Sequence, residues 1–395
     1  MSTLNRSRSL FLSVSLLVLL PVASGVLWSA VSATRSDDGE DSLYKYLAIF
    51  SEVFGLVRSS YVDAPDSDRL MSGALDGVGD ALDPFSSLVP AAEVPSYERM
   101  LTIGTSRSGL RLAKDRGITF VAAVEEGSPA AAAALQRGDL VAELGGVETR
   151  ATPLWRLESR LAGEPGEAIA LRLLRDGETV PATLVLAEFP APAPRVDEVR
   201  SAPRLLVPRL DAAAPQRVRA LLGELAGKDR LLVDLRGVAG GDAEAAYAIG
   251  ALFATGELGR LERRGAVERE FRSDEPAAWK GRLVVLVDGG TLGAAEVLAA
   301  ILRDGAGAEI VGQRSFGWAG ERTFVDLASG ARIHLTTAFY TGPKGEALAG
   351  GLAPDLLVDD LSRRVDEGER SLDELILDRG IERLLAEDDS AQHAA

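Results

Sequence analysis

The chain has 395 residues, 46% of them hydrophobic and 26% charged, which is typical of a folded protein of two or three domains rather than a disordered one. Its 59 acidic and 43 basic residues give a net charge of −16 without any lysine- and arginine-rich run, which argues against nucleic-acid binding. The absence of cysteine excludes disulfides and thiol chemistry, and two histidines, His334 and His393, are too few for a histidine-based metal site. We expect no cofactor and no metal.

The amino terminus predicts an export segment over residues 1–36. No charged residue occurs from Ser9 to Thr34, a stretch long enough as a helix to cross a hydrocarbon core of roughly 30 Å. Basic residues precede it and an acidic run follows it, which predicts an inside amino terminus and an exported remainder. Two alternatives stay open: a membrane anchor that holds the body on the periplasmic side of the inner membrane, or a signal peptide that is cleaved after small residues to give a secreted protein.

Residues 42–100 predict a helical arm. Apolar residues from Leu43 to Val57 recur at helical spacing. A turn is expected at Asp63–Asp68, and a second helix is expected to end near Asp83 and Pro84.

Residues 104–187 predict a small β-rich unit with two helices. Strands are expected at 118–124 and on both sides of the Gly145-Gly146 and Asp176-Gly177 turns, and an amphipathic helix near 154–162.

A proline-rich segment at 187–198 predicts a stiff linker. Beyond it, over residues 188–385, buried strands alternate with helices, which is typical of an α/β domain whose sheet is covered by helices. Residues 386–395 form a polar tail.

In this order the segments resemble the C-terminal processing (tail-specific) serine peptidases. The resemblance covers roughly residues 43–385 and implies a mixed α/β protein with an export segment, a helical arm, a PDZ domain at 104–187 and a peptidase domain at 188–385. The motifs that carry it are, in chain order, DPFSS at 83–87, GSPAAAAALQRGD at 127–139, LLVDLRGVAGG at 231–241 and IVGQRSFGWAGER at 310–322.

The positions that the resemblance would make catalytic hold other residues. Glu296 fixes the register of a turn in which active members carry the serine nucleophile, and that position is Gly293, which has no side chain to form an acyl-enzyme. The general-base lysine is replaced by Trp318, whose indole N–H is only a donor. The orienting glutamine corresponds to Arg322. No intact catalytic residue is therefore predicted.

Two hydroxyl groups are close enough in sequence to be substitutes. Thr291 lies two residues before the nucleophile position and Ser315 three before the lysine position. A substitute needs a base within hydrogen-bonding reach. The only lysines after residue 200 are Lys228, Lys280 and Lys344, none of them in the matching turn, and His334 has the surroundings of an ordinary strand histidine.

Two backbone features are predicted to survive. Gly240 and Gly241 could present amide groups as an oxyanion hole does, or they could form a tight turn that simply needs glycine. Ser108, Gly109, Leu110 and Leu112 match the position of the PDZ loop that captures a carboxyl terminus, with the two leucines as an apolar wall and Arg111 solvated. The alternative for this segment is a plain edge strand.

The resulting hypothesis is a cell-envelope pseudopeptidase that binds protein C-termini or unfolded tails. An active peptidase relative or an envelope adaptor is a candidate partner, and the membrane is reached through the amino-terminal segment. The alternatives are an active serine-type endopeptidase with a relocated centre and a purely structural protein without peptide affinity.

Overall fold

The computed structural model describes residues 38–359 and 370–386. The predicted export segment at 1–36 lies outside these residues, as does the tail after Ala386. Within the described part, no helix has the length and apolar character needed to cross a membrane.

The chain divides into two compact units, residues 1–72 and 73–395. The first contains helix α2 (Asp38–Ser60) and the beginning of α3 (Ser67–Leu82). These helices agree with the predicted arm, and α3 ends one residue before Asp83, where Pro84 cannot continue a helix. The predicted arm is not helical throughout, because strand β1 (Ser87–Val89) interrupts it before the 3₁₀-helix η1 (Ala91–Glu93) and α4 (Val94–Ile103).

The second unit contains a small antiparallel sheet in the order β2-β3-β4-β6-β7, with β5 beside β4. Its members are β2 (Leu110–Asp115), β3 (Ile118–Val124), β4 (Leu140–Leu144), β5 (Val147–Glu148), β6 (Ala168–Arg175) and β7 (Glu178–Val185). Two helices accompany it, α5 (Pro129–Ala132) and α6 (Leu154–Leu161). We call residues 104–187 the small domain. Its predicted strands, helices and two-residue turns are confirmed.

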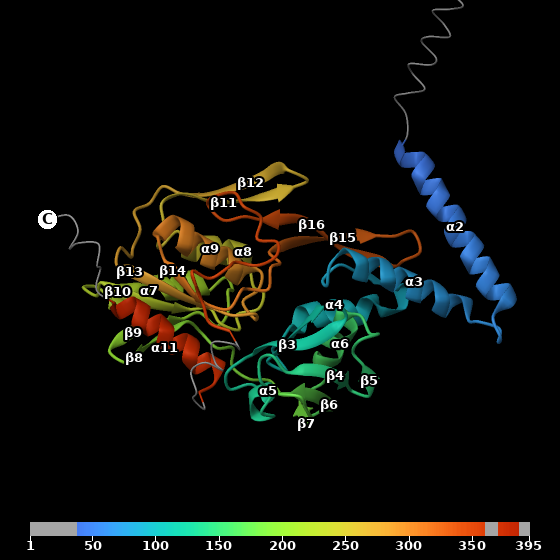
Figure 1. Ribbon diagram of the computed structural model, residues 1–395, viewed down its shortest axis with the longest axis horizontal. Coiled ribbons are helices and arrows are strands. Elements are labelled where there is room, and N and C mark those ends of the chain that lie inside the picture. The colour runs from blue at the N-terminus through green and yellow to red at the C-terminus, as the bar shows by residue number, and fades with distance from the viewer. Residues whose placement is uncertain (1–37, 360–369, 387–395) are drawn as a thin grey trace, which may run out of the picture. The chain divides into compact units, whose positions relative to one another are not determined.

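A larger sheet has the order β17-β14-β13-β10-β9-β8, parallel except for the β8–β9 pair (Figure 1). Strands β10 (Arg230–Asp234) and β13 (Arg282–Val287) are nearly continuous apolar runs, as strands buried on both faces require. The remaining strands are β8 (Arg195–Val199), β9 (Ala202–Leu206), β14 (Glu309–Gly312) and β17 (Leu356–Leu357). Strand β8 begins inside the segment that was predicted as a linker, so that prediction is wrong from Arg195 onward.

Helices cover both faces of this sheet. One face packs against α7 (Ala214–Glu224), α8 (Ala243–Gly250) and α9 (Ala294–Ala306), whose buried residues form the main apolar core. The other face packs against α11 (Leu372–Leu385). The predicted α/β architecture is confirmed. Ligands of such sheets bind at the carboxyl ends of the parallel strands, which here carry the loops after β10, β13 and β14.

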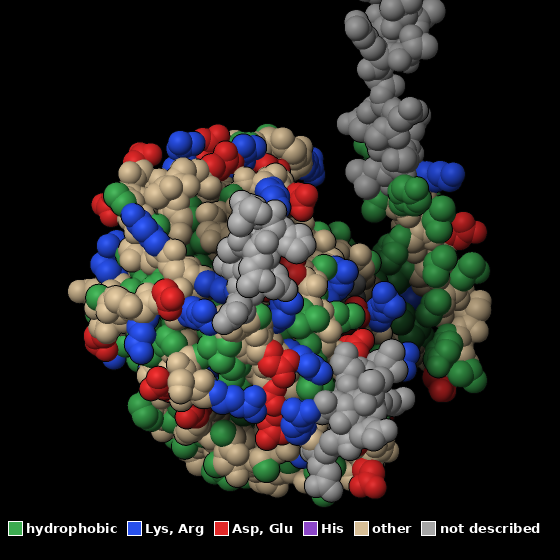
Figure 2. Space-filling model, turned by 60° about the vertical axis from the view of Figure 1, so that its left-hand side comes forward, with side chains coloured by type: hydrophobic (Ala, Val, Ile, Leu, Met, Phe, Trp, Pro, Cys, Tyr) green, Lys and Arg blue, Asp and Glu red, His purple; other side chains and the backbone are tan. Residues whose placement is uncertain are grey.

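A further sheet has the order β1-β16-β11-β12, with β15 also paired to β16. It contains β11 (Gly256–Arg263), β12 (Ala266–Ser273), β15 (Gly320–Asp326) and β16 (Arg332–Tyr340). Because β1 pairs with β16, the segment after α3 is an integral strand of the second unit. Charged side chains of both signs are intermingled on the face shown in Figure 2, so the net negative charge is not gathered there into one acidic patch.

Candidate functional site

The loop from β13 to α9 contains the predicted nucleophile position. Gly293 directly precedes the first residue of α9 and has φ +69° and ψ −120°, a conformation that favours glycine. An added Cβ would lie 3.4 Å from Gly240 Cα, so there is space for a side chain although the backbone would be strained. The structure thus places Gly293 at a sharp turn, with no reactive atom on it.

Glu296 holds this turn against the segment after β14. Its buried carboxylate accepts the Gly293 N–H at 3.0 Å and the Trp318 N–H at 2.9 Å through Oε2. Its Oε1 accepts the Gly317 N–H at 2.6 Å and the Ser315 hydroxyl. Burial raises the pKa of Glu296, and the hydrogen bonds to its carboxylate oppose that rise. Glu296, from which the register of the nucleophile position was assigned, therefore joins the two loops in the structure.

Trp318, at the predicted base position, fills its surroundings with an indole ring. The ring centroid is 4.2 Å from that of Phe85, and Arg322 places its guanidinium carbon 5.8 Å from the Trp318 ring centroid. Gly320 permits this packing, because a Cβ there would be 2.8 Å from the indole. The buried Trp318 Nε1 has no hydrogen-bond partner in the described chain. Trp318 supplies a donor and an apolar wall, and it offers no lone pair that could accept a proton.

The two glycines predicted for an oxyanion hole have different surroundings. The Gly240 N–H donates to the Leu292 carbonyl oxygen at 3.0 Å, so the turn itself uses this amide. Gly241 has φ +102°, and an added Cβ would lie 2.8 Å from the carbonyl oxygen of Leu210. A tight turn that needs glycine is therefore present at Gly241.

The two candidate substitute hydroxyls are both buried and engaged. The Thr291 hydroxyl donates to the Leu235 carbonyl at 2.9 Å and accepts the Asp288 N–H at 3.0 Å. Thr291 is 0% exposed, so a substrate carbonyl has no path to it. Ser315 donates to Glu296 and accepts the Leu352 N–H at 2.7 Å. Neither hydroxyl is poised as a nucleophile in this arrangement.

Among the described residues, none of the lysines considered as bases forms a hydrogen bond with the Thr291 or Ser315 hydroxyl. Lys344 makes an ion pair with Asp304 at 3.0 Å. His334 is buried on β16 and accepts or donates at Nδ1 to the Tyr97 hydroxyl, 2.6 Å away, with Phe324 stacked on it at 4.0 Å between ring centroids. Burial first, and then the charge of Arg322, lowers the pKa of His334 to about 3. A histidine with this pKa is a weak base.

The predicted carboxylate loop of the small domain uses its amides internally. The Ser108 and Gly109 N–H groups both donate to the Thr105 carbonyl oxygen, at 3.2 and 2.7 Å. The Leu110 N–H donates to the Ser108 hydroxyl at 3.2 Å. These three donors are therefore already satisfied in this arrangement.

The side chains of the same segment differ from the expectation. Leu110 and Leu112 are buried in the core of the small domain. Leu110 lines a pocket and Leu112 does not, so the predicted apolar wall is wrong for Leu112. Arg111 is not simply solvated, because it forms an ion pair with Glu158 of α6 at 3.3 Å. The cause is the position of α6 directly beside β2.

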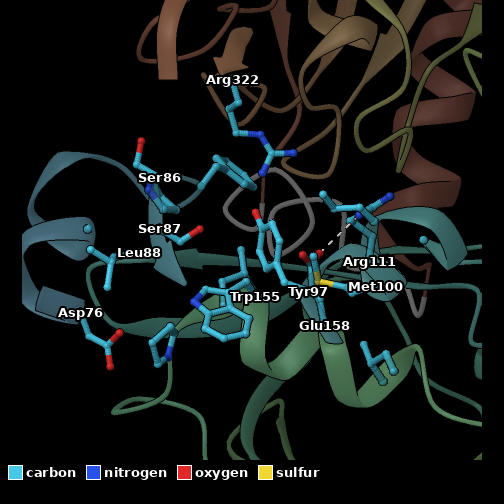
Figure 3. Close-up of a pocket in the computed structure, with 18 of the residues that line it drawn as sticks. Asp76, Ser86, Ser87, Leu88, Tyr97, Met100, Arg111, Trp155, Glu158 and Arg322 are labelled. Carbon is cyan, nitrogen blue, oxygen red and sulfur yellow. Dashed lines mark hydrogen bonds and ion pairs between the residues drawn. The ribbon is translucent and has the colours of Figure 1, made fainter. Parts of the chain in front are cut away.

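That pocket has a volume of about 200 Å³ and lies between β2, α6 and α4 (Figure 3). Apolar side chains, among them Met100, Trp155 and Leu161, form much of its wall. The buried Trp155 Nε1 and Arg111 Nε have no hydrogen-bond partner among the described residues. A buried donor without a partner is costly, and an acceptor on a ligand would satisfy it.

One side of the pocket carries polar groups that sequence reasoning did not bring together. In Figure 3 the Tyr97 hydroxyl points toward Arg322, and the Ser87 hydroxyl points toward Tyr97. Burial raises the pKa of Tyr97, while Ser87 and the charge of Arg322 lower it in part. Of these groups only Ser87 belonged to a motif noted in the sequence, DPFSS at 83–87, and it was given no role in a site.

A second cavity of about 1040 Å³ lies at the carboxyl ends of β10 and β13, lined by the small domain as well. Its buried carboxylate Asp288 accepts the Gly237 and Gly290 N–H groups through Oδ1, at 2.9 and 3.0 Å. Arg137 of the small domain completes it with an ion pair at 2.8 Å to Oδ2. Within residues 38–359 and 370–386 no cluster of three metal-ligating side chains occurs.

Comparisons with known proteins find similar sequences and a similar fold. The family model described as peptidase family S41 matches residues 205–358. The carboxy-terminal-processing protease of Bartonella bacilliformis is 27% identical over 369 residues, which cover 88% of this chain and 80% of the relative. The carboxyl-terminal-processing protease of Synechocystis sp. is 29% identical and covers 77% of this chain and 75% of its own length.

A solved structure agrees in fold. The photosystem II D1 C-terminal processing protease superimposes with a TM-score of 0.64 at 22% identity, over 82% of this chain and 97% of that one. At this identity the match supports the mixed α/β architecture alone. It extends over both the small domain and the larger sheet, since it covers most of the chain.

Proposed function

We propose that the chain is a pseudopeptidase of peptidase family S41 that binds protein C-termini or unfolded tails. The match of residues 205–358 to the model of that family and the likeness to carboxy-terminal-processing proteases support this proposal. The observation that carries the proposal is the pair Gly293 and Trp318. Acyl transfer by a serine-type peptidase needs a hydroxyl nucleophile and a base that takes its proton. The two loops that would hold these groups are joined by the Glu296 carboxylate, and neither loop carries its group.

The absence of a nearby substitute supports the same proposal. Thr291 and Ser315 use their hydroxyls in buried hydrogen bonds within the loops. Moving either hydroxyl to a substrate would leave buried backbone groups without partners, at a cost of about 1–3 kcal/mol for each group.

We propose that the small domain is a PDZ domain and that it binds the peptide. Among the described residues, β2 pairs with β3 alone, so its other edge is available to an added strand. An extended peptide added to such an edge gains main-chain hydrogen bonds, and pockets beside the edge select its side chains. The pocket between β2 and α6 lies where such selection would occur.

We further propose that the body acts outside the cytoplasm, anchored by residues 1–36 or released by their cleavage. The uncharged stretch from Ser9 to Thr34 and the acidic run after it motivate this. An active relative of the same family or an envelope adaptor is the proposed partner, because a peptide-binding frame without hydrolysis can present or withhold tails from an active enzyme.

The direct experiment is incubation of the purified full chain with unfolded protein substrates, with products followed by mass spectrometry. We expect no cleavage above a buffer control. Specific cleavage that a Gly293→Pro change abolishes would contradict the proposal. The triple change Gly293→Ser, Trp318→Lys and Arg322→Gln is the matched gain-of-function arm, and cleavage by this variant alone would support the register.

An active endopeptidase is the alternative, favoured by the protease names of the relatives. It predicts that a hydroxyl-directed covalent probe labels the chain at Thr291 or Ser315. The proposal above predicts no label at either position under conditions in which an active family member is labelled fully.

A further inference from the structure

The pocket between β2, α6 and α4 contains one guanidinium without an acidic partner. Arg111 is paired with Glu158, and Asp76 at the other end of the pocket is paired with Arg156 at 2.9 Å. Arg322 lines the pocket and has no carboxylate within ion-pair distance among the described residues. The pocket therefore carries one uncompensated positive charge in a chain whose net charge is −16.

The guanidinium of Arg322 is oriented rather than free. Its carbon lies 5.8 Å from the centroid of the Trp318 ring, and Trp318 is held in turn against Phe85, 4.2 Å away between centroids. Cation–π contact fixes the plane of a guanidinium over a ring and leaves its N–H edge available. In Figure 3 that edge lies on the side of the pocket where the Tyr97 and Ser87 hydroxyls point.

The hydroxyl groups of Tyr97 and Ser87 add further polar groups to the pocket beside Arg322. The Tyr97 hydroxyl is 2.6 Å from His334 Nδ1, and because His334 is neutral at ordinary pH, Tyr97 can donate there and keep its lone pairs for another donor. Ser87 has a hydroxyl hydrogen that can turn toward Tyr97 or toward a bound oxygen. Met100, Leu101 and Leu161 add apolar surface to the pocket, and the charged groups near them, Arg111 and Glu158, are paired with each other. The pocket therefore combines an unpaired guanidinium with apolar wall.

We propose that Arg322 is the carboxylate receptor of this pocket, holding the carboxylate of a bound peptide while the peptide's apolar side chain enters beside Met100 and Leu161. This rests on the proposed peptide-binding function and assigns the recognition to a side chain. The loop amides of Ser108 and Gly109, which would otherwise hold a carboxylate, already donate to Thr105. A planar guanidinium binds a carboxylate through two parallel hydrogen bonds, which an ammonium cannot do.

A carboxylate could come from the peptide's terminus or from an acidic side chain, and the experiment separates the two. Dye-labelled decapeptides ending in Ala, Val, Leu or Phe are titrated against the full chain by fluorescence anisotropy. Each is compared with its carboxyl-amidated form and with an amidated form that ends in Glu. Wild-type protein is expected to bind the free-carboxyl form on the order of tenfold more tightly than the amidated form, as a charge-assisted pair implies.

Arg322→Gln is expected to remove that difference, lowering affinity for the free-carboxyl peptide about tenfold and leaving the amidated form unchanged. Arg322→Lys should retain only part of the difference. Arg264→Gln is the control for loss of one positive charge, because Arg264 is exposed on the β11–β12 turn. This variant should leave both peptide affinities unchanged. If the wild-type protein binds the amidated peptide that ends in Glu as tightly as the free-carboxyl peptide, Arg322 recognises a carboxylate on an acidic side chain rather than the terminal carboxylate.

If Arg322→Gln leaves the ratio of the affinities for free-carboxyl and amidated peptides unchanged, this inference is overturned while the proposed peptide binding stands. Equal binding of both forms by the wild type would overturn it as well. Failure of every peptide to bind would instead contradict the proposed function itself, and the inference with it.

Discussion

Arg322 lies over the ring of Trp318, with 5.8 Å between the guanidinium carbon and the ring centroid. The sequence resemblance assigns these two positions to the orienting and basic groups of a peptidase. In this chain they contact each other, and Phe85 also packs against the Trp318 ring. We therefore expect the two replacements to depend on each other for stability.

The first prediction tests that dependence. Trp318→Lys should lower the free energy of unfolding by about 3 kcal/mol, because it removes a large packed ring and places an ammonium beside Arg322. Arg322→Gln alone should cost less than about 1 kcal/mol, the value of an exposed cation–π contact. Denaturant unfolding of both single variants and the double variant gives a coupling energy, which we expect to be about 1 kcal/mol.

Additive effects in that cycle would show that the two residues only happen to lie close together. The control pair is Trp279→Phe with Arg264→Gln, in which the first residue is buried and the second is exposed on the β11–β12 turn. This pair should be additive, since distant sites without shared partners usually are.

Glu296 is the subject of the second prediction. Glu296→Gln replaces one acceptor oxygen with an NH₂ group. In either orientation of the amide this group faces backbone N–H donors, those of Gly293 and Trp318 or that of Gly317. A buried donor facing a donor leaves both without partners, so we expect a loss of about 1–3 kcal/mol in the free energy of unfolding. Glu178→Gln on β7, which is exposed, is the matched control. An equal effect of the two changes would mean that Glu296 does not hold the turn.

A third prediction concerns Arg137, which reaches from the small domain to Asp288 at 2.8 Å. Arg137→Met leaves Asp288 buried and charged without its cation, and breaking a buried pair in this way costs about 3–5 kcal/mol. Hydrogen exchange should show faster opening of the 288–293 loop, because Asp288 also accepts the Gly237 and Gly290 amides. Arg137→Lys should retain most of the protection. Unchanged exchange in Arg137→Met would show that Asp288 is held by the backbone alone.

Much of the fold could be predicted from local patterns. The apolar runs of β10 and β13 have no polar interruption, and the Asp176-Gly177 turn has the positive φ angles that a two-residue hairpin needs. The β8–β9 hairpin was missed because its turn, Arg200-Ser201, adopts positive φ without glycine or asparagine, so the sequence carries no turn signal there.

Only those features of the candidate site that depend on neighbouring residues in the sequence could be predicted. The register of Gly293 and Trp318 follows from motifs within single loops. The polar end of the pocket depends on contacts between distant segments, since Tyr97 and His334 are 237 residues apart in sequence. No periodicity links such residues, and only the pairing of β1 with β16 brings Ser87 next to them.

The last prediction uses His334, whose pKa is lowered by burial and by Arg322 to about 3. The unfolded chain binds a proton near the ordinary pKa of about 6.5, so between these values the unfolded state holds more protons and the free energy of unfolding rises with pH. The stabilisation is complete above the unfolded pKa and is lost as the pH falls toward the folded pKa. Between neutral pH and about pH 5 the loss should be about 2 kcal/mol. His334→Asn keeps an acceptor for Tyr97 but cannot titrate, so its unfolding free energy should fall less over this range. Parallel pH profiles for wild type and His334→Asn would contradict a buried neutral histidine, whereas a steeper wild-type profile confirms it.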